Sequence, residues 1–388
     1  MKIVIAPDSF KESMTALEVC EAAERGLKKT FPGAEIVKVP VADGGEGTVQ
    51  ALVDATNGRM TKLSVTGPLG QPADAEYGWL GDGKTAVIEM ASASGLHLVP
   101  PERRNPLITT SAGTGDLIRD AVKKGAEHII IGIGGSATND GGMGMARALG
   151  ALFLDDQKKE IGHGGGALAE LAEIDVSGLM SQLSKVKIEV ACDVDNPLTG
   201  PNGASAIFGP QKGATAESVA ILDRNLAHFA SFLKQTTGAD VAQTKGAGAA
   251  GGLGAGLMAF LNAELKSGVD IVLNTVNLKQ HMSDADLVIT GEGRIDGQTI
   301  HGKTPAGVSK LAKEHGIPVI ALAGSIGEGY ESVYEAGIGA VFSIVPGIVT
   351  LEEALRKGPQ YVEQTIANIG YLLKRDIMKI KRNENSRC

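Results

Sequence analysis

The stretch that decides the fold runs from Ile129 to Ala146 and reads I-I-I-G-I-G-G-S-A-T-N-D-G-G-M-G-M-A. The run Ile129–Ile133 is short, apolar and rich in β-branched residues, which predicts a buried strand. A glycine-rich polar loop follows, and apolar residues of a helix begin at Met143. This order is typical of an anion site, because glycine lets the backbone approach a ligand and helix N-termini attract negative charge. Helix capping by the polar loop residues is the competing interpretation.

The same order of strand, polar loop and helix recurs near both ends of the chain. Short apolar strands are predicted at 2–6 and 35–39, each followed by a polar loop and a helical pattern. Three more strands are predicted at 285–290, 318–323 and 340–345. Because alternating strands and helices favour parallel sheets, we expect these five strands to form one sheet.

The domain organisation follows from that sheet. Since its strands come from both ends of the chain, residues 1–62 and 285–388 are assigned to a Rossmann- or flavodoxin-like α/β domain with a doubly wound, mostly parallel sheet. Residues 63–284 are predicted to form an inserted mixed α/β domain that carries the glycine-rich loops. The expected fold class is therefore α/β with two domains, as a length of 388 residues also suggests.

Hydrophobic periodicity places the remaining elements. They are a hairpin turn at 81–83, a strand at 187–191, helices at 15–29, 217–234, 305–314 and 351–374, and a Gly/Ala segment at 245–256 that leads into a helix through Leu265. Ligands of such folds bind beyond the carboxyl ends of the strands, so the polar loops at those ends are the candidate sites.

Composition and charge exclude several classes of partner. The net charge is −8 and aromatic residues make up 4% of the chain, which disfavours nucleic acid. No apolar run reaches the ~20 residues of a membrane-spanning helix, so no membrane partner is expected. Three cysteines without metal-ligand spacing indicate a reducing compartment, and the first residues do not resemble a signal peptide. We expect a cytoplasmic protein, and the oligomeric state stays open.

Two short patterns match nucleotide-binding motifs only formally. Gly297–Thr304 fits G-x-x-x-x-G-K-[ST], but about seven residues separate it from the predicted strand and Pro305 follows at once. Lys303 is instead predicted to contact a phosphate as a point charge. Gly246–Gly251 fits G-x-G-x-x-G, yet polar residues rather than a strand precede it. This second segment is predicted to bind nucleotide phosphates or to allow close helix packing.

Charged residues stand in the loops that follow several predicted strands. Asp43, Asp193 and Asp195 are so placed, and an aspartate there can accept a hydroxyl proton or bind Mg²⁺. Asx turns and helix caps are the alternatives for these aspartates. The planar fork of Arg294 matches a carboxylate or phosphate, whereas Lys11 is either a ligand contact or a solvated lysine. Anion-binding loops, cations and carboxylates together are the parts that phosphoryl transfer needs.

Six motifs, in this order, resemble the bacterial type 1 glycerate kinase family, the glycerate 2-kinases. They are D-S-F-K from Asp8, A-D-G-G-E-G-T from Ala42, G-G-S-A-T-N-D-G-G-M-G from Gly134, C-D-V-D-N-P-L from Cys192, G-A-G-A-A-G-G-L-G from Gly246 and T-G-E-G-R-I-D from Thr290. The resemblance implies a two-domain α/β kinase that uses ATP and Mg²⁺ to phosphorylate D-glycerate. It further implies transfer to the 2-hydroxyl, giving 2-phospho-D-glycerate and ADP, with the 3-hydroxyl as the alternative.

The resemblance and the residue chemistry together assign roles, with the active site expected in the cleft between the domains. Asp193, or else Asp43, is predicted to orient or deprotonate the glycerate hydroxyl. Lys11 and Arg294 are predicted to neutralise the phosphoryl group and the substrate carboxylate, and Asp296 to bind the metal. Substrate or nucleotide binding is predicted for Ser9, Gly44, Gly45, Gly134, Gly135, Ser136, Thr138, Asn139, Asp140, Asn196, Gly248, Gly251, Gly252, Glu292 and Lys303. Which glycine-rich loop binds ATP and which binds D-glycerate stays open.

Two other functional classes remain as alternatives to the kinase. The first is an NAD-dependent hydroxy-acid oxidoreductase, which the misplaced G-x-G-x-x-G pattern disfavours. The second is a non-catalytic nucleotide or metabolite sensor, which would bind ATP without turnover and tolerate Asp193→Asn.

Overall fold

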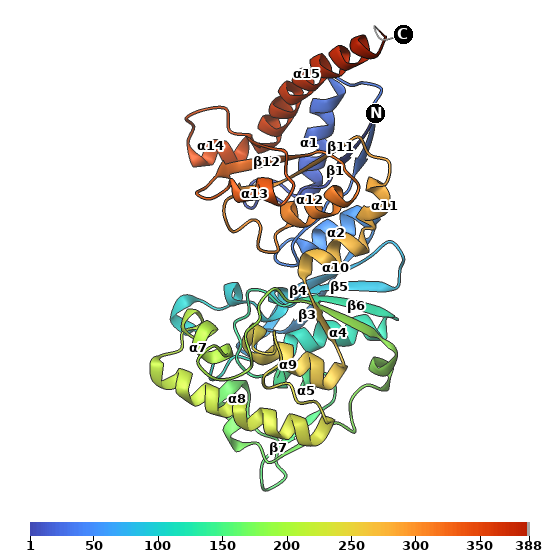
Figure 1. Ribbon diagram of the computed structural model, residues 1–388. Helices are drawn as coiled ribbons and strands as arrows, with labels where there is room; N and C mark the ends of the chain where they lie inside the picture. The colour runs from blue at the N-terminus through green and yellow to red at the C-terminus, as the bar shows by residue number, and fades with distance from the viewer. Residues whose placement is uncertain (386–388) are drawn as a thin grey trace. The chain divides into compact units, whose positions relative to one another are not determined.

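A computed structural model describes residues 1–385, with side chains through Arg375, and they form two compact units (Figure 1). Unit 1 contains Met1–Asp43, Gln50–Thr56 and the chain from Val269 onward. Unit 2 contains Gly44–Val49 and Asn57–Gly268. The chain therefore passes from one unit to the other after Asp43, Val49, Thr56 and Gly268.

Unit 1 is built on a five-stranded parallel sheet. Its strands are β1 (Lys2–Ile5), β2 (Glu35–Lys38), β11 (Leu287–Ile295), β12 (Val319–Ile326) and β13 (Ala340–Ser343). They lie in the order β2-β1-β11-β12-β13, and every neighbouring pair is parallel. The sheet predicted from the two ends of the chain is therefore confirmed, in the strand order of a flavodoxin-like doubly wound fold.

Helices surround this sheet, and their ends follow local sequence signals. They are α1 (Ala16–Lys28), most of α2 (Thr48–Thr56) and α10 (Gly268–Thr275), α11 (Leu278–Met282), α12 (Thr304–Glu314), α13 (Ser332–Glu335), α14 (Leu351–Arg356) and α15 (Gly358–Asn385). Thr15 and Glu18 form a capping box at the start of α1. Helices α1 and α15 lie side by side, and a Cβ at Gly26 would be 2.5 Å from the Glu363 carbonyl oxygen. Gly26 thus permits this close helix contact.

Strand β11 is longer than the sequence predicts. The composition of the segment from Gly291 onward predicts a loop, yet the strand continues to Ile295. It stays paired with β12, where Glu292 lies opposite Ala323 and Arg294 opposite Ser325. The glycines and charged residues of this segment resemble a loop in composition, but the continued ladder of hydrogen bonds makes it a strand.

Unit 2 contains a mixed six-stranded sheet and a small hairpin. The sheet has the order β10-β9-β6-β5-β4-β3, in which β5, β6, β9 and β10 are parallel and β3 and β4 are antiparallel. The bounds are β3 (Arg59–Thr66), β4 (Pro72–Trp79), β5 (Thr85–Glu89), β6 (His128–Gly132), β9 (Lys187–Ala191) and β10 (Glu264–Lys266), with β7 (Leu152–Leu154) and β8 (Glu173–Asp175) in the hairpin. The predicted turn at 81–83 does join two antiparallel strands.

The helices of unit 2 pack against this sheet around a buried apolar core. They are α3 (Ala91–Ser94), α4 (Ala112–Lys123), α5 (Met143–Ala148), α6 (Gly164–Ala167), α7 (Ala204–Phe208), α8 (Ala216–Thr237) and α9 (Ala249–Leu261). Strand β6 supplies Ile129 and Ile131 to the core, both fully buried. The quoted stretch therefore forms a buried strand, a loop and a helix start within unit 2, as predicted.

Two predicted helices are wrong in extent. The helix expected to run through Leu265 ends at Leu261, because Asn262 adopts a left-handed conformation (φ 51°) and residues 264–266 pair with β9 instead. The helix expected at 351–374 is two helices, α14 and α15, with Lys357 between them. Hydrophobic periodicity continues through both breaks, so it could not reveal them.

The compact units also divide the chain differently from the predicted boundaries near 62 and 284. Residues 57–62 belong with unit 2, because β3 begins at Arg59 and pairs with β4. Residues 269–284 belong with unit 1, where Val269 lies against Gly307 of α12. Among the described residues, no helix is both long and apolar enough to cross a membrane.

Candidate active site

The carboxyl edge of the unit 1 sheet gathers acidic side chains from separate strands. Asp8 follows β1, and Glu292 lies on β11, the next strand in the sheet. The order of strands reverses between these two, which is where doubly wound folds bind their ligands. Asp43 follows β2 on the other side of β1, and its charge acts on both Asp8 and Glu292. The topology thus brings three carboxylates to one end of one sheet.

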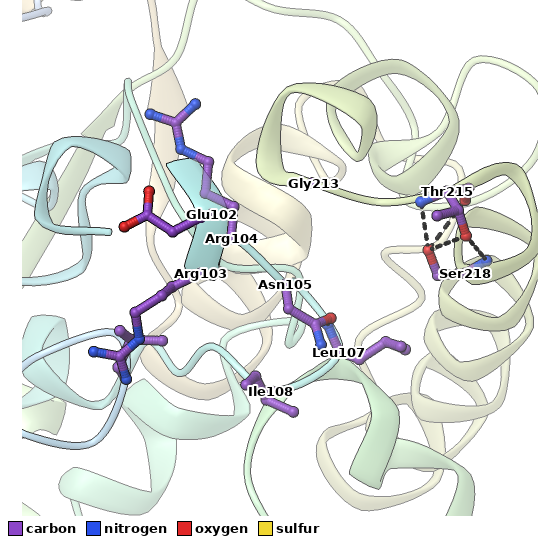
Figure 2. Close-up of a pocket in the computed structure, with 10 residues that line it drawn as sticks. Glu102, Arg103, Arg104, Asn105, Leu107, Ile108, Gly213, Thr215 and Ser218 are labelled. Atoms are coloured by element: carbon purple, nitrogen blue, oxygen red, sulfur yellow. Dashed lines mark hydrogen bonds between the residues drawn. The ribbon is translucent and has the colours of Figure 1, made fainter. Parts of the chain in front are cut away.

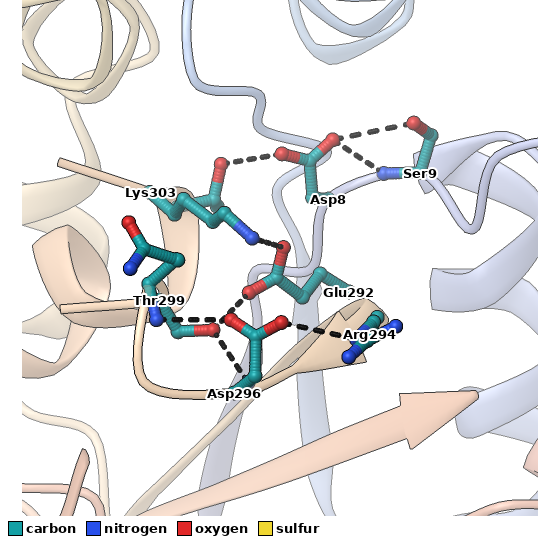
Figure 3. A network of polar contacts seen from close by, with 9 residues as sticks. Asp8, Ser9, Glu292, Arg294, Asp296, Thr299 and Lys303 are labelled. Carbon is teal, nitrogen blue, oxygen red and sulfur yellow. Dashed lines mark hydrogen bonds and ion pairs between the residues drawn. The ribbon is translucent and has the colours of Figure 1, made fainter. Parts of the chain in front are cut away.

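Asp8 is held by hydrogen bonds from two directions (Figure 3). Its Oδ2 accepts from Thr304 Oγ1 at 2.6 Å, and its Oδ1 accepts from the Ser9 backbone N–H at 2.6 Å. Burial raises the pKa of Asp8 to about 6, and the negative charge of Asp43 adds to that shift. Sequence analysis did not single out Asp8, although its position directly after β1 matches that of Asp193 after β9.

Glu292 is a second buried carboxylate of this edge with a raised pKa. Its Oε1 accepts a hydrogen bond from Thr299 Oγ1 at 2.8 Å, and its Oε2 lies 3.6 Å from Lys303 Nζ. Burial raises the pKa of Glu292 to about 7, with Asp8 and Asp43 adding to the shift and Lys303 opposing it. Strongly shifted carboxyl groups that cluster at a sheet edge are typical of functional sites.

Arg294 and Asp296 form a neighbouring pair that is open to solvent on the arginine side. Arg294 Nε donates to Asp296 Oδ2 at 3.0 Å, and the arginine side chain is 65% exposed. The other carboxylate oxygen of Asp296 accepts from the Gln298 backbone N–H, and this bond leads the causes that lower the pKa of Asp296. The pair therefore orients the guanidinium group, which suits Arg294 to anion binding, while the predicted metal role of Asp296 stays a prediction.

The G-x-x-x-x-G-K-T pattern lies closer to a strand than the sequence predicts. Because β11 ends at Ile295 and α12 begins at Thr304, only Asp296 separates the strand from the pattern, which reaches the first residue of the helix. Its backbone, however, is already occupied: the N–H groups of Gly297 and Thr299 donate to carbonyl oxygens, and that of Gln298 donates to Asp296. A P-loop needs such groups for phosphate, so this loop does not have that structure.

Lys11 lies apart from the hydrogen-bonded network. Its side chain is exposed and makes no hydrogen bond or ion pair with any residue up to Arg375. Its backbone lies beside Gly293 of β11, where a Cβ would be 3.6 Å from the Lys11 nitrogen. The lysine is thus near the edge that carries Glu292, and its contact with a ligand stays a prediction.

The carboxyl edge of the unit 2 sheet gathers a second set of predicted residues. Asp193 follows β9, is exposed, and accepts a hydrogen bond at Oδ1 from the Gly268 backbone N–H at 3.1 Å. Gly44 lies on the same edge, where an added Cβ would be 2.6 Å from the Gly268 Cα and 2.9 Å from the Ala191 Cβ. Asp193 and the segment that begins at Gly44 are therefore brought together within unit 2.

Neighbouring residues of this edge have structural partners. Asp195 forms an ion pair with Lys245 in which both side chains are well exposed. Asn196 donates from Nδ2 to the Asn202 carbonyl, and its own carbonyl accepts from the Gly248 N–H. Asn196 thereby shapes the turn after Asp195, and its contact with a ligand stays a prediction. Glu89, which sequence analysis missed, accepts from the Val49 N–H near the start of α2.

The loop that opens this edge after β6 has two different halves. Gly134 and Gly135 are exposed, and their N–H groups donate to no residue in the described part of the chain. Thr138, Asn139 and Asp140 are fully buried instead. Asp140 accepts hydrogen bonds from the backbone N–H groups of Ser111, Gly142 and Gly144, and from the Ser111 hydroxyl. The first half can therefore meet an anion, whereas Asp140 anchors the second half. Ligand contact by Thr138, Asn139 and Asp140 stays a prediction.

A buried lysine that sequence analysis missed lies behind this loop. Lys212 is 1% exposed, and its Nζ donates to Ser136 Oγ and to the Thr138 carbonyl, both at 2.7 Å. Burial lowers the pKa of Lys212 to about 7, while the negative charge of Asp140 opposes the shift. The sequence offers no signal for it, because a lone lysine between Gln211 and Gly213 resembles any surface residue.

Lys212 predicts a pH dependence of stability. Its pKa of about 7 in the folded chain lies below the ordinary value of 10.5, so between these values the unfolded chain binds more protons. The free energy of unfolding should therefore rise with pH above 7, by up to about 1.4 kcal/mol per pH unit. Urea denaturation at pH 7 and pH 9 should show this rise in the unchanged protein and in Lys234→Met, a surface control, but not in Lys212→Met. Equal slopes in all three would contradict the assignment.

The second glycine-rich segment packs directly against the first. Residues Ala250, Gly251 and Gly252 adopt left-handed conformations that interrupt the start of α9. Gly251 accepts a hydrogen bond from the Gly141 N–H, and a Cβ on it would be 2.0 Å from the Thr138 carbonyl oxygen. A Cβ on Gly248 would be 2.2 Å from the Pro197 carbonyl oxygen. Close packing therefore accounts for these glycines, and their contact with a ligand stays a prediction.

Gly251→Ala should test this packing. The substitution places a Cβ against backbone and forces alanine to φ +70°, so we expect a loss of about 2–5 kcal/mol in unfolding free energy. Gly238→Ala is the matched control, because Gly238 has φ +77° but nothing within 4 Å of an added Cβ. That control should lose only about 1–2 kcal/mol. Similar losses in the two variants, measured by urea denaturation, would show that the contact is unimportant.

Unit 2 also has a pocket of about 510 Å³ that contains none of the predicted site residues (Figure 2). The segment 102–108 lines one side, and residues at the start of α8 line the other. Arg103 and Arg104 extend away from Thr215 and Ser218, which bond to each other as the capping box of α8. The charges and the helix start therefore do not converge on one point.

The chain and its fold match known proteins throughout their length. The model of the glycerate kinase family matches residues 3–374. Glycerate kinase of Bacillus subtilis (strain 168) is 62% identical, covering 96% of this chain and 98% of that protein. Glycerate 2-kinase of Escherichia coli (strain K12) is 57% identical, covering 96% and 98%. A crystal structure from Salmonella typhimurium LT2, provisionally named glycerate kinase 2, has a TM-score of 0.92 at 54% identity and covers 97% of this chain and 99% of that one.

Proposed function

This chain belongs to the glycerate kinase family, and we propose that it transfers the γ-phosphoryl group of ATP to the 2-hydroxyl of D-glycerate, giving 2-phospho-D-glycerate and ADP. Membership makes it a phosphotransferase that acts on an alcohol group. Family membership therefore argues against the oxidoreductase and against the non-catalytic sensor. Transfer to the 2-hydroxyl is supported by one observation: a relative named glycerate 2-kinase is 57% identical over 96% of this chain.

The unit 2 edge supplies the groups for the accepting hydroxyl and for an anion. Asp193 is exposed and accepts a hydrogen bond at Oδ1 from the Gly268 N–H, and a carboxylate held in this way is suited to orient the hydroxyl or accept its proton. Gly134 and Gly135 present backbone N–H groups, and Ser136 adds a hydroxyl. These donors match a carboxylate or a phosphate. The proposal gives Asp193 the role of general base and this loop the role of anion cradle.

The unit 1 edge supplies positive charge for the phosphoryl group. Arg294, held by Asp296, offers an oriented guanidinium group, and Lys303 stands beside Glu292 as a second cation. Phosphoryl transfer depends mainly on such positioning and charge neutralisation. We assign to both cations, with Lys11, the neutralisation of the phosphates and of the substrate carboxylate.

The acidic residues of the structure show whether the expected Mg²⁺ could be bound. Among the side chains that the structure describes, those of residues 1–375, no group of three or more acidic, cysteine or histidine residues is placed to bind a metal alone. Magnesium sites in kinases need only one or two carboxylates, because substrate phosphates and water complete them. One or two of Asp8, Asp43 and Glu292 would serve, since their mutual repulsion favours a cation. Bound Mg²⁺ would supply neutralisation of phosphate charge.

Product identification tests the proposal. The protein is incubated with D-glycerate, Mg²⁺ and ATP, and phosphorus NMR distinguishes the two phosphoglycerates. A 2-phosphoglycerate signal is expected. A 3-phosphoglycerate signal would keep the kinase and reverse the orientation of the substrate. Release of ADP without either product would indicate another acceptor, and no turnover would contradict the proposal.

A further inference from the structure

Lys212 has no part in the proposed reaction, yet its amine is bonded to the loop that is assigned to an anion. We propose that Lys212 is a positioning residue, whose buried charge turns the Ser136 hydroxyl outward as a hydrogen-bond donor to an anionic substrate group at Gly134–Ser136. This inference deepens the proposed function and rests on its assignment of that loop. It adds a role for a residue that would not touch the substrate.

The chemistry of the Lys212 amine decides which group donates in its hydrogen bond with Ser136. An ammonium group has three donors and no acceptor, so Ser136 Oγ must accept from a charged Lys212. The Thr138 carbonyl can only accept, and it takes a second N–H. A serine hydroxyl has a single proton. Since its oxygen accepts from Lys212, that proton is available for another acceptor.

A neutral amine would allow the opposite arrangement. It has a lone pair, so the Ser136 hydroxyl could donate inward to Lys212 and be lost to the anion. Burial sets the pKa of Lys212 at about 7, and Asp140 is the charged residue that acts on it. The two arrangements therefore exchange near neutral pH. An anion at the loop favours the charged form, which couples anion binding to uptake of a proton.

The surroundings of Ser136 fit this role. Ser136 is 5% exposed, and the two residues before it are exposed with unused N–H groups. Successive backbone N–H groups of this kind form anion-binding concavities. Asp140 does not compete for the lysine protons by a hydrogen bond, because its oxygens accept from Ser111, Gly142 and Gly144. The charge of Lys212 is thus held against Ser136, the residue that follows the two exposed glycines.

Calorimetry on the unchanged protein tests the coupling without relying on turnover. D-glycerate and ATP with Mg²⁺ are titrated separately at pH 6 and pH 8.5, in two buffers of different ionisation enthalpy. For the substrate whose anion binds at the loop, we expect proton uptake at pH 8.5 and an affinity about tenfold to a hundredfold weaker than at pH 6. Which titration shows the effect identifies that group as phosphate or carboxylate. No proton uptake with either substrate would overturn the proposal.

Variants distinguish a role of Lys212 in positioning the Ser136 hydroxyl from a role in folding alone. Ser136→Ala keeps the lysine but should lose most of the pH-dependent part of the affinity, with KM changed more than kcat. Lys212→Arg should flatten the pH profile, since arginine stays charged. Lys234→Met is the surface control and should behave like the unchanged protein. An unaltered pH profile in Ser136→Ala would overturn the proposal even if Lys212 variants fail to fold.

The outcomes also distinguish the inference from the function beneath it. Formation of 2-phosphoglycerate without proton uptake would sustain the kinase and reject the role of Lys212. Proton uptake on binding, with no phosphoglycerate formed, would sustain the coupling and reject the proposed reaction.

Discussion

Asp193→Asn is expected to lower kcat by about 10²–10⁴, the usual contribution of a general base. Asparagine keeps the shape of the side chain and can still accept the hydrogen bond from the Gly268 N–H. It cannot accept a proton from the hydroxyl at neutral pH. The defect should therefore appear in kcat with little change in the KM for ATP, measured in a coupled assay of ADP release. A loss below tenfold would remove Asp193 from this role.

Asp195→Asn is the matched control for that experiment. Asp195 is two residues away on the same turn, carries the same charge, and is exposed in an ion pair with Lys245. Exposed ion pairs contribute little to stability, so this variant should stay within about threefold of the unchanged kcat. A larger loss in Asp195→Asn than in Asp193→Asn would mean that the base is assigned to the wrong aspartate.

The second large effect is expected from Arg294→Ala. Loss of one oriented donor to a developing charge costs about 10²–10³ in rate in comparable sites. Arg294 is 65% exposed, and its one described ion pair is with Asp296, so its removal should leave the unfolding free energy nearly unchanged. Arg294→Lys should recover only part of the activity, because lysine lacks the planar fork. Full activity in Arg294→Ala would contradict the assignment.

Asp296→Asn separates the two roles considered for that aspartate. If Asp296 orients Arg294, the variant should lose about tenfold in kcat/KM, and added Mg²⁺ should not restore it, since the loss lies in an ordinary hydrogen bond. If it binds the metal, raising the Mg²⁺ concentration should restore activity. A Mg²⁺ titration of this variant therefore decides between the structural pair and the ligand predicted from the sequence.

Much of the fold is encoded in local sequence patterns. Strands such as β1 and β6 are short, apolar and succeeded by glycine or proline, so their existence and their parallel arrangement could be predicted. The same reasoning places Asp43 after β2, and its charge acts on Asp8, which follows the neighbouring strand β1. Gly44 also follows β2, but it lies against Gly268 and Ala191 of unit 2, which the sequence did not predict. Residues directly after buried strands can be assigned to a common edge from the sequence, because neighbouring parallel strands end together.

The rest depends on contacts between distant residues. Thr138, Asn139 and Asp140 look alike as ligand groups in the sequence, but the structure buries all three, and only the fold shows that Asp140 binds the backbone of its own loop. Gly251 looks like part of a phosphate loop, whereas its tight fit against Thr138 explains the glycine. Lys212 meets Ser136 across 76 residues of chain. No local pattern encodes such a contact, so it required the folded structure.

The strand order of unit 1 has a consequence for biosynthesis. β1 lies between β2 and β11, yet β11 starts only at Leu287. At about 5–20 residues per second, a ribosome needs roughly 15–60 s to reach it after β1 has been made. Until then β1 and β2 form at most a two-stranded pair, which is marginal in water, and the apolar residues Ile3 and Ile5 lack their final neighbours. The nascent chain thus carries an unfinished sheet edge while unit 2 is being completed, and it is during that interval that chaperones would protect it.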